Sequence, residues 1–569
     1  MNERETIKAA YACAAFEKMD LDLSLSLQGD GRLFIAPDTL RSLSERAFTD
    51  IAFYLRRSHL AALSELLEDP SSSANDLYVI ETLLRNALIA SRRELPLCQD
   101  TGTATLVGWK DEGIHTGVDD CAEIEEGARR AYARGNLRSS QVASLTFFKE
   151  FDTGNNLPAQ VHLEASPDGE EGPALRLLFV AKGGGSANKT SLFQMTKALL
   201  EKEPFEAFLR EKVAALGVAA CPPYRLCVVV GGTSAEENLR ILKLATTEIL
   251  DAAPLLPQKD EKPSQASAHN CLKRDPYWEQ KLGEIAQESG LGAQFGGSAL
   301  ALDTRVFRLP RHAGSCPVSM GVSCSAHRNA LAYIDASGVW LEALEKNPAE
   351  YLLHRGGRSA RIAEAFLANK KASSGPEDHR IDLDKGMREV CSNLHKLKVG
   401  DRVLLNGSLL VARDAAHLKW HELLAEGKEL PSYLKEHPIY YAGPADTPEG
   451  KAIGSFGPTT AQRMDAYAEE LMSEGASLIT LAKGNRAQSW TAACKKYGGF
   501  YLGTVGGAAA LLAEENILSS SIIDYSELGM EAVRLIMVRD LVAFIITDDK
   551  GNDLFSTCTT RFHPTPCPA

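Results

Sequence analysis

The sequence predicts an α/β protein with two domains, a larger N-terminal one at residues 1–372 and a smaller C-terminal one at residues 380–569. β-rich runs alternate with stretches of helical periodicity, and glycine clusters separate many of them. A polar stretch at 367–379, which includes Gly-Pro, interrupts this pattern. Because domain boundaries fall in linkers of this composition, we place the boundary there. The C-terminal part then has about 190 residues, a normal domain size.

The N-terminal domain is expected to begin with helices and to continue with strands that end in glycine. Residues 1–95 are expected to be rich in helix, because apolar residues from Ile51 to Leu60 fall roughly at helical spacing and residues 77–92 continue that pattern. The β-rich runs Leu177–Val180 and Arg225–Val230 each lead into consecutive glycines. Ser234 then opens a capping-box pattern, which predicts a helix that reaches Leu250. Such a strand, turn and helix can face an anion, but the residues alone favour an ordinary αβ connection.

The C-terminal domain is predicted to contain a hairpin, a helix and a strand. Arg402–Leu405 and Leu409–Ala412 are strand-like, and the Asn-Gly between them is typical of a hairpin turn. The periodicity across residues 464–471 predicts a helix, which Gly475 ends. The strand Leu478–Ala482 then leads directly into a lysine.

The composition is that of a globular protein and argues against several functions. Apolar residues are 44% and charged residues 24%, which excludes a disordered, collagen-like or coiled-coil chain. The net charge of −13 argues against nucleic-acid binding, and no apolar run reaches 18 residues, so no membrane span is expected. The acidic opening Met1–Glu5 fits neither a secretory signal nor a mitochondrial presequence. We expect a cytoplasmic protein, with mitochondria not excluded because a trimmed chain would look the same.

The twelve cysteines include no CxxC pair, so the signatures of zinc ribbons, thioredoxin-type sites and ferredoxin loops are missing. Two segments nevertheless place a cysteine where it can bind a metal. Cys98 and Asp100 lie in a loop with an amide and two hydroxyls, although an ordinary turn explains that loop somewhat better. Cys221 precedes two prolines, which make the backbone rigid. A rigid backbone suits a cysteine that binds a metal, and it equally suits the ordinary start of a strand.

Two further segments carry cationic groups. Residues 308–328 combine two cysteines, two histidines and arginines that can neutralise an anionic ligand, but a solvated basic loop is the favoured local interpretation. In residues 457–463, Thr459 or Thr460 can cap the helix that follows. An arginine lies in the first turn of that helix, so a binding site for a carboxylate is about as plausible as simple capping. His417 and His421 stand at i, i+4, but no HExxH frame exists and a surface helix is favoured over a zinc site.

Taken together, these segments resemble the iron–sulfur (class I) fumarate hydratases in their single-chain form. The resemblance runs from about residue 50 onward, in the family's order. The matching segments are LPLCQDTGTA (95–104), GNLRSSQ (135–141), AKGGGSANKT (181–190), AACPPYRL (219–226), GAQFGGSALALDTRVFRLPRH (292–312), SCPVSMGVSCSA (315–326), LVARDAAH (410–417), GPTTAQRMD (457–465) and LAKGN (481–485).

The resemblance implies a 4Fe-4S cluster held by Cys98, Cys221 and Cys324. In the family the third ligand lies twelve positions after a Pro-x-His histidine, and His312 to Cys324 is that interval, so Cys316 is taken as a neighbour. Three cysteines leave one iron open to water and substrate, as in a catalytic metal site.

The resemblance further implies reversible hydration of fumarate to (S)-malate, with tartrate or methylfumarate (mesaconate) as alternative diacids. Thr459 would be the base and Asp100 the acid toward the hydroxyl group. A swivelling C-terminal domain would complete a site between the domains, in a homodimer. The implied substrate-binding residues are Gln99, Asp100, Arg138, Gly184, His312, Arg413, Thr459, Thr460, Arg463 and Lys483.

Some features leave alternatives open. His312 fits a structural hydrogen-bonding role as well as a substrate role, and His327 stands where the family often has aspartate. The Ala-Gly order after His312 is also the reverse of the usual one. These departures replace no proposed ligand but put the fine substrate preference in doubt. An iron–sulfur sensor without turnover and a zinc hydrolase remain rivals from other classes.

Overall fold

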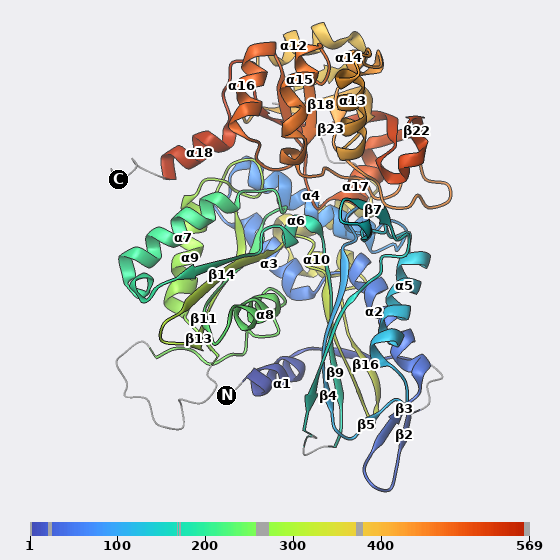
Figure 1. Cartoon of the computed structure of the whole chain (residues 1–569), viewed down its shortest axis with the longest axis vertical. Coiled ribbons are helices and arrows are strands. Elements are labelled where there is room, and N and C mark those ends of the chain that lie inside the picture. The colour runs from blue at the N-terminus through green and yellow to red at the C-terminus, as the bar shows by residue number, and fades with distance from the viewer. Residues whose placement is uncertain are drawn as a thin grey trace.

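The computed structural model describes residues 3–20, 25–167, 169, 172–257, 272–370 and 379–562 (Figure 1). The N-terminal region is rich in helix, as its periodicity predicts, but three short strands lie between its first and second helices. The expected continuous spacing from Ile51 to Leu60 is interrupted, because the backbone is extended at Tyr54 and Arg56 between two helices. The helices are α1 (Glu3–Cys13), α2 (Pro37–Phe53), α3 (Arg57–Glu68) and α4 (Ala74–Ala90).

A six-stranded mixed sheet follows, and α2 and α5 (Asp120–Arg134) pack together on one face of it. Its order is β1 (Phe16–Lys18), β16 (Gly338–Glu342), β15 (Asn329–Asp335), β9 (Leu175–Lys182), β4 (Thr103–Asp111) and β8 (Gln160–Ser166). Two smaller sheets stand apart from it, made of β2 (Leu25–Leu27), β3 (Leu33–Ile35) and β5 (Ile114–His115), and of β6 (Val142–Thr146) and β7 (Lys149–Asp152).

A second, five-stranded sheet is built around β11 (Tyr224–Gly232), which is buried along its whole length. Alternate side chains of β11 enter different cores, so both faces of this strand are covered, which explains its continuous apolar sequence. Helix α8 (Ala235–Ala245) starts at the predicted cap Ser234 but ends before Leu250. The other elements are β10 (Ser191–Met195), β14 (Cys316–Ser323), β13 (Ala301–Arg311), β12 (Lys273–Arg274), α6 (Gly184–Ala187), α7 (Lys202–Leu216) and α9 (Pro276–Glu288).

The C-terminal half holds a seven-stranded sheet in which β23 (Val533–Thr547) pairs with both β18 and β21, so that β18, β19, β20, β21 and β23 close into a ring. Helices surround this ring, at the top of Figure 1. The strands are β17 (His379–Asp382), β18 (Arg402–Val411), β19 (Ile439–Tyr440), β20 (Ile479–Ala482), β21 (Phe500–Gly503) and β22 (Ile517–Asp524). The helices are α12 (Met387–Leu394), α13 (Asp414–Ala425), α14 (Tyr433–Glu436), α15 (Ala468–Ser473), α16 (Gln488–Tyr497), α17 (Ala509–Leu511) and α18 (Leu554–Phe562).

The predicted hairpin at residues 402–412 is wrong. These residues form the single strand β18, which pairs with β23 on both sides of a register shift between Leu405 and Gly407. Gly407 has a φ of 116°, a conformation that favours glycine. A glycine within a strand often marks a bulge, and the long partner β23 holds the chain extended through it.

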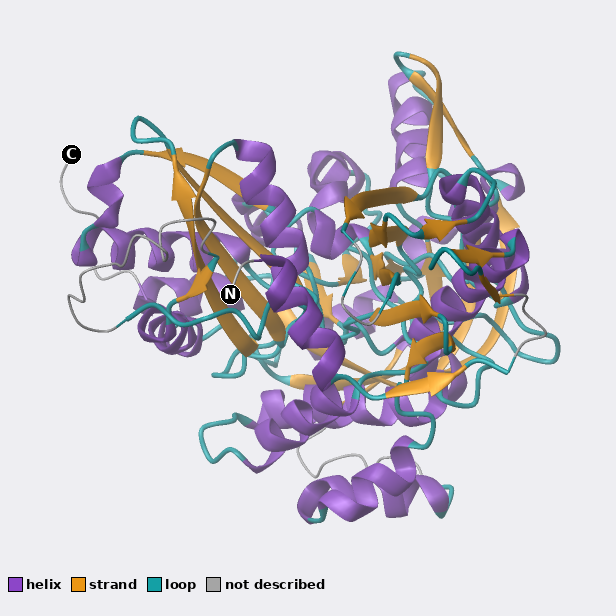
Figure 2. Ribbon diagram, turned by 90° about the horizontal axis from the view of Figure 1, so that it is seen from below, coloured by secondary structure: helices purple, strands orange, loops and turns teal. Residues whose placement is uncertain are grey.

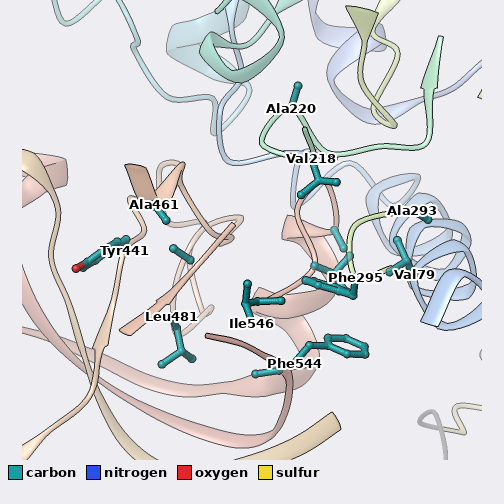
Figure 3. Close-up of a cluster of buried hydrophobic side chains, with 14 of the residues drawn as sticks. Val79, Val218, Ala220, Ala293, Phe295, Tyr441, Ala461, Leu481, Phe544 and Ile546 are labelled. Atoms are coloured by element: carbon teal, nitrogen blue, oxygen red, sulfur yellow. The ribbon is translucent and has the colours of Figure 1, made fainter. Parts of the chain in front are cut away.

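The two halves share one core. Phe295 from the N-terminal half stacks on Phe544 of β23 with ring centroids 4.1 Å apart (Figure 3). The last N-terminal strand is β16, and α10 (Pro348–Arg355) and α11 (Gly357–Leu367) then pack against α3 and α4. The strands are flanked by helices in the view from below (Figure 2). The predicted α/β fold with two parts is thus confirmed.

The exact domain boundary stays a prediction, because residues 371–378 of the proposed linker lie outside the described residues. In the described part of the chain, no helix has the length and apolar character that a membrane span requires.

Candidate active site

Three cysteines from separate loops meet at one end of the five-stranded sheet. Cys221 precedes β11 and Cys324 follows β14, and the antiparallel pairing of Arg225 with Ser323 puts them at the same sheet end. The Ser325 N–H donates to the carbonyl oxygen of Cys221 at 3.1 Å. Cys98, from the loop between α4 and β4, is close enough for its charge to influence the pKa of Cys221. The three thiols therefore form one group.

Burial favours the protonated form of two of these thiols, Cys98 and Cys221. Burial raises the pKa of Cys98 and raises that of Cys221 to about 11. The nearby Lys483 opposes both shifts, and its ammonium nitrogen donates to Cys221 Sγ at 2.9 Å. Because thiolate is the form that binds metal, a metal bound by these cysteines would displace their protons, and the ammonium group of Lys483 would stabilise the resulting negative charge on Cys221.

The donor set fits a polynuclear iron–sulfur group better than a single ion. Among the described residues, no three Cys, His, Asp or Glu groups are placed to hold one metal ion together. A single ion would need its sulfur ligands about 2.3 Å from one point, whereas each cysteine of a cluster binds its own iron. Cys316 lies at the opposite end of β14 from Cys324, about 25 Å along the strand, and is fully buried. This favours Cys324 over Cys316 as the third ligand.

Asp100 lies among cations beside this group. Burial by itself would raise the pKa of Asp100, but the charges of Arg138, Arg328 and Lys483 outweigh it and lower the pKa. The Gly184 N–H donates to Asp100 Oδ2 at 2.8 Å, and Arg138 Nη2 lies 3.4 Å from Oδ1. These cations keep the Asp100 carboxylate ionised, and a dianionic ligand bound beside it would raise its pKa and make it a better proton acceptor.

The C-terminal half contributes its residues at the carboxyl ends of parallel strands. β18, β19 and β20 run parallel, and Arg413 and Lys483 follow the ends of the first and third of these strands. The carboxyl ends of parallel strands meet at one edge of the sheet, where ligands commonly bind. Thr459 joins this edge, since its N–H donates to Tyr441 at 2.8 Å and its carbonyl accepts from the Lys483 N–H at 3.1 Å.

The two halves are joined directly through this site. Gln99 Nε2 donates to the carbonyl of Pro458 at 3.1 Å, next to Thr459. Arg138 Nη1 donates to the carbonyl of Gly443 at 2.9 Å. The cleft residues of one half are thus positioned by the backbone of the other.

Three buried guanidinium groups retain free donors. The Nε atoms of Arg138, Arg328 and Arg413 have no hydrogen-bond partner among the described residues. Buried donors of this kind are rare and call for a ligand or water. Arg413 also pairs with Glu531, and Arg463 pairs with Asp414 at 2.6 Å. The arrangement can hold a small diacid through its carboxylate oxygens.

The predicted helix cap is only partly right. Thr460 occupies the N-cap position of the helical turn Ala461–Tyr467, but its side chain makes no capping bond, and the turn is a 3-10 helix before α15. Arg463 Nη1 reaches Thr459 Oγ1 at 3.5 Å. The Thr459 hydroxyl therefore accepts a bond from Arg463, and no capping bond engages the hydroxyl of Thr460.

His312 makes no described contact with the other predicted residues. It is exposed after β13, and the contact described for its ring is the Gly314 N–H donating to Nδ1 at 3.1 Å. Gly184, by contrast, lies at the site through its bond to Asp100.

Sequence reasoning missed two residues at the site. Arg328 is buried, and its charge influences Cys98, Cys324 and Asp100; only the general arginine content of its segment pointed to it. Gly506, from the loop after β21, had no local signal. A Cβ at Gly506 would lie 2.4 Å from Cys221 Sγ.

Replacing Gly506 by alanine is therefore expected to push Cys221 away from its position. The added methyl group overpacks the site, which costs about 1–3 kcal/mol and reduces loading with iron. Iron and sulfide content after anaerobic purification measure the effect. Gly29→Ala is the matched control, because a Cβ there meets nothing within 4 Å. Equal iron content in both variants would contradict the expectation.

The histidine pair at residues 417 and 421 does not form a metal site in the described structure. His417 donates from Nδ1 to the carbonyl of Arg413 at 2.8 Å, whereas His421 pairs with Glu470 at 2.7 Å. The buried His417 instead supports the backbone of Arg413.

Replacing His417 by glutamine is expected to make the protein less sensitive to acid. Burial lowers the pKa of His417 from 6.5 to about 4, so on acidification the unfolded chain binds a proton that the folded chain excludes. This stability is fully present above about pH 7 and is lost as the pH falls toward 4, by up to about 1.4 kcal/mol per unit. Urea titrations across this range measure it, with exposed His354→Gln as the control. The same pH dependence in wild type and His417→Gln would contradict the assignment.

Fold and site together define an α/β protein whose thiol-lined, cation-rich centre is assembled from both halves of one chain. The family model "Fumarate hydratase (Fumerase)" matches residues 41–333, and "Fumarase C-terminus" matches residues 338–558. The chain belongs to the class I fumarate hydratase family.

Individual relatives agree with this family. Fumarate hydratase 2 of Leishmania major is 49% identical over 93% of this chain and 88% of its own length. Fumarate hydratase class I, aerobic, of Escherichia coli (strain K12) is 49% identical over 93% of this chain and 91% of its own. A putative L(+)-tartrate dehydratase subunit beta of Methanocaldococcus jannaschii is 37% identical over 30% of this chain and 90% of its own length.

Proposed function

We propose that this protein catalyses the reversible hydration of fumarate to (S)-malate. The observation that carries the proposal is a group of buried cations with unsatisfied donors, Arg138, Arg328 and Arg413. The first two act on Asp100, and Arg413 lies close enough to Arg138 for its charge to lower the pKa of that group. These donors suit a small dianion, and the family to which the chain belongs carries the same activity in its relatives' names. Malate formation from fumarate, followed anaerobically on the purified protein, tests it directly.

The proposed metal ligands are Cys98, Cys221 and Cys324. A 4Fe-4S cluster bound by these three residues would offer one iron without a cysteine, which acts as a Lewis acid toward a carboxylate and a hydroxyl group. Lys483 and Arg328 offset the negative charge that such a centre brings. Iron and sulfide quantitation test the cofactor separately from activity.

Asp100 and Thr459 would handle the protons. In hydration, the Asp100 carboxylate accepts the proton of the incoming water, and in dehydration the acid returns it to the leaving hydroxyl. Thr459 would exchange the proton on the neighbouring carbon. A hydroxyl is a weak base, so its ionised form needs the positive charge of Arg463, whose guanidinium lies 3.5 Å from Thr459 Oγ1.

The diacid would be oriented by donors from both halves. Arg138 and Arg413 are the clamps for the two carboxylates, with Gln99, Gly184, Thr460 and Lys483 beside them. His312 remains a proposed substrate residue on the resemblance alone, since its exposed ring contacts its own loop.

Tartrate or mesaconate is the alternative substrate. A single methyl group is worth about 10–200-fold in specificity, so fumarate should exceed mesaconate by at least about tenfold in kcat/KM. Initial rates on the three diacids, measured on one anaerobic preparation, decide between them. No turnover of fumarate together with turnover of another diacid would replace the proposed substrate, and no turnover at all would favour a sensor.

We also propose a homodimer in the cytoplasm, with mitochondria as the alternative compartment. The cysteines in the described part of the chain are all free thiols, which suits a reducing compartment. An acidic chain of net charge −13 gives no reason to expect a nucleic-acid partner.

A further inference from the structure

The two guanidinium groups proposed to clamp the diacid meet at one residue, Gly443. Arg138 belongs to the N-terminal half and Arg413 to the C-terminal half, and each is 9% exposed. Nη1 of Arg138 donates to the carbonyl of Gly443 at 2.9 Å, and a Cβ atom added to Gly443 would lie 2.7 Å from Nη1 of Arg413. Burial and the charge of Arg413 lower the pKa of Arg138, against the opposing charge of Asp100. The two clamps are therefore close neighbours, and Gly443 lies against both.

In each guanidinium group, one nitrogen is left for a ligand. Nη2 of Arg413 pairs with Glu531, and Nη2 of Arg138 lies 3.4 Å from Asp100 Oδ1. Nη1 of each arginine is close to Gly443, and the buried Nε of each has no hydrogen-bond partner among the described residues. Because the guanidinium group is planar and rigid, these contacts fix its orientation. The separation of the two free Nε donors thus depends on where Gly443 lies.

Close contact, and not backbone conformation, is the reason for glycine at position 443. Gly443 does not have a positive φ, so its conformation is open to other residues, whereas its distance to Arg413 leaves no room for a Cβ atom. The backbone on both sides of this contact is held in place. The Tyr441 carbonyl accepts the Thr459 N–H at 2.8 Å, and the Arg413 carbonyl accepts from the N–H and the ring of His417 at 3.0 and 2.8 Å. A side chain at position 443 would therefore displace the guanidinium group rather than the backbone.

We propose that Gly443 is a positioning residue, which sets the spacing of the two clamps and so the length of the diacid that the site accepts. This inference rests on the proposed function, because it takes Arg138 and Arg413 as the groups that bind the two carboxylates. A methyl group at position 443 would move the Arg413 guanidinium group away from Gly443, and so away from the other clamp. The wider site would then fit a four-carbon diacid less well and a five-carbon diacid better.

Gly443→Ala is expected to lower kcat/KM for fumarate by about 10–100-fold, mainly through a higher KM. The clamps hold the substrate both before and during the reaction, so their displacement weakens binding more than it slows turnover. Iron and sulfide content should remain those of the wild type, because the atoms that the methyl group would meet belong to Arg413. Gly29→Ala is the control, since a Cβ there meets nothing within 4 Å.

Two unreactive diacids test the spacing itself. Calorimetric titration of the anaerobic holoenzyme with succinate and with glutarate, which is one methylene longer, gives an affinity for each without turnover. Gly443→Ala should shift the preference toward glutarate by about tenfold relative to the wild type. If the wild type binds succinate but does not hydrate fumarate, the proposed reaction fails while the inference stands. A Gly443→Ala enzyme with the wild-type KM and the wild-type preference overturns the inference alone.

Arg413→Lys shows whether Gly443 acts through this arginine. Lysine has a compact ammonium group in place of the guanidinium group, so adding Gly443→Ala to Arg413→Lys should change succinate binding little further. The double variant also relieves the crowding, so it is expected to fold even if circular dichroism shows that Gly443→Ala does not. A full additional loss of affinity in the lysine background, or an equal weakening of both diacids by Gly443→Ala, would overturn the proposal.

Discussion

A Cys221→Ser variant is expected to lose its iron and its fumarate hydratase activity together, with turnover falling to background. Cys221 is buried against Lys483 and Gly506, and serine oxygen is a poor replacement for a soft thiolate toward iron. The ammonium group of Lys483 would then face a hydroxyl in place of sulfur. Iron, sulfide and visible absorption are measured on protein purified without oxygen, beside malate formation.

The control for this variant is Cys227→Ser on β11, the strand that follows Cys221. Cys227 is fully buried and its thiol donates to the carbonyl of Ala245 at 3.3 Å, a bond that serine can also make. We expect it to keep its iron and activity. Cys316→Ser should behave like this control and Cys324→Ser like Cys221→Ser. The reverse result for the last pair would show that the third ligand is misassigned.

A Thr459→Ala variant is expected to lose about 10²–10⁴-fold in kcat while it retains a full complement of iron. The hydroxyl is the group that would exchange the carbon-bound proton, and the alanine chain keeps the backbone bonds of residue 459 to Tyr441 and Lys483. The structure around the cations should therefore persist. Steady-state kinetics and the visible spectrum of the same sample separate catalysis from loading.

Thr459→Ser provides the conservative comparison, because it restores a hydroxyl near Arg463. Recovery of most of the rate in this variant supports a role for the oxygen itself. A Thr459→Ala enzyme with wild-type kcat would exclude Thr459 as the base. A Thr459→Ala variant that lacks iron would instead show that Thr459 has a structural role in the site.

The local patterns in the sequence were good guides to many elements. The strands at Leu177–Val180 and Arg225–Val230 exist, and the cap at Ser234 begins α8. The pattern at residues 402–412 failed because Asn-Gly fits a bulge within a strand as well as a turn between two strands. Only pairing with β23, more than a hundred residues later, distinguishes these possibilities.

The candidate site was likewise predictable from the sequence only in part. Its cysteines, threonines and most of its cations lie in short segments that were recognisable together. Gly506 was not, because its role depends on the absence of a side chain 2.4 Å from a sulfur atom that belongs to the other half. The exposure of His312 was equally invisible in its motif.

By itself, the sequence determined the α/β class, the family and the chemical groups available for catalysis. Those depend on short-range backbone preferences and on residue types, which neighbouring positions record. The tertiary structure alone decided that Cys98, Cys221 and Cys324 meet, that Cys316 lies at the opposite end of β14 from Cys324, and that Arg138 and Arg413 keep free donors. Long-range strand pairing and the shared core fix these distances, and no local pattern contains them.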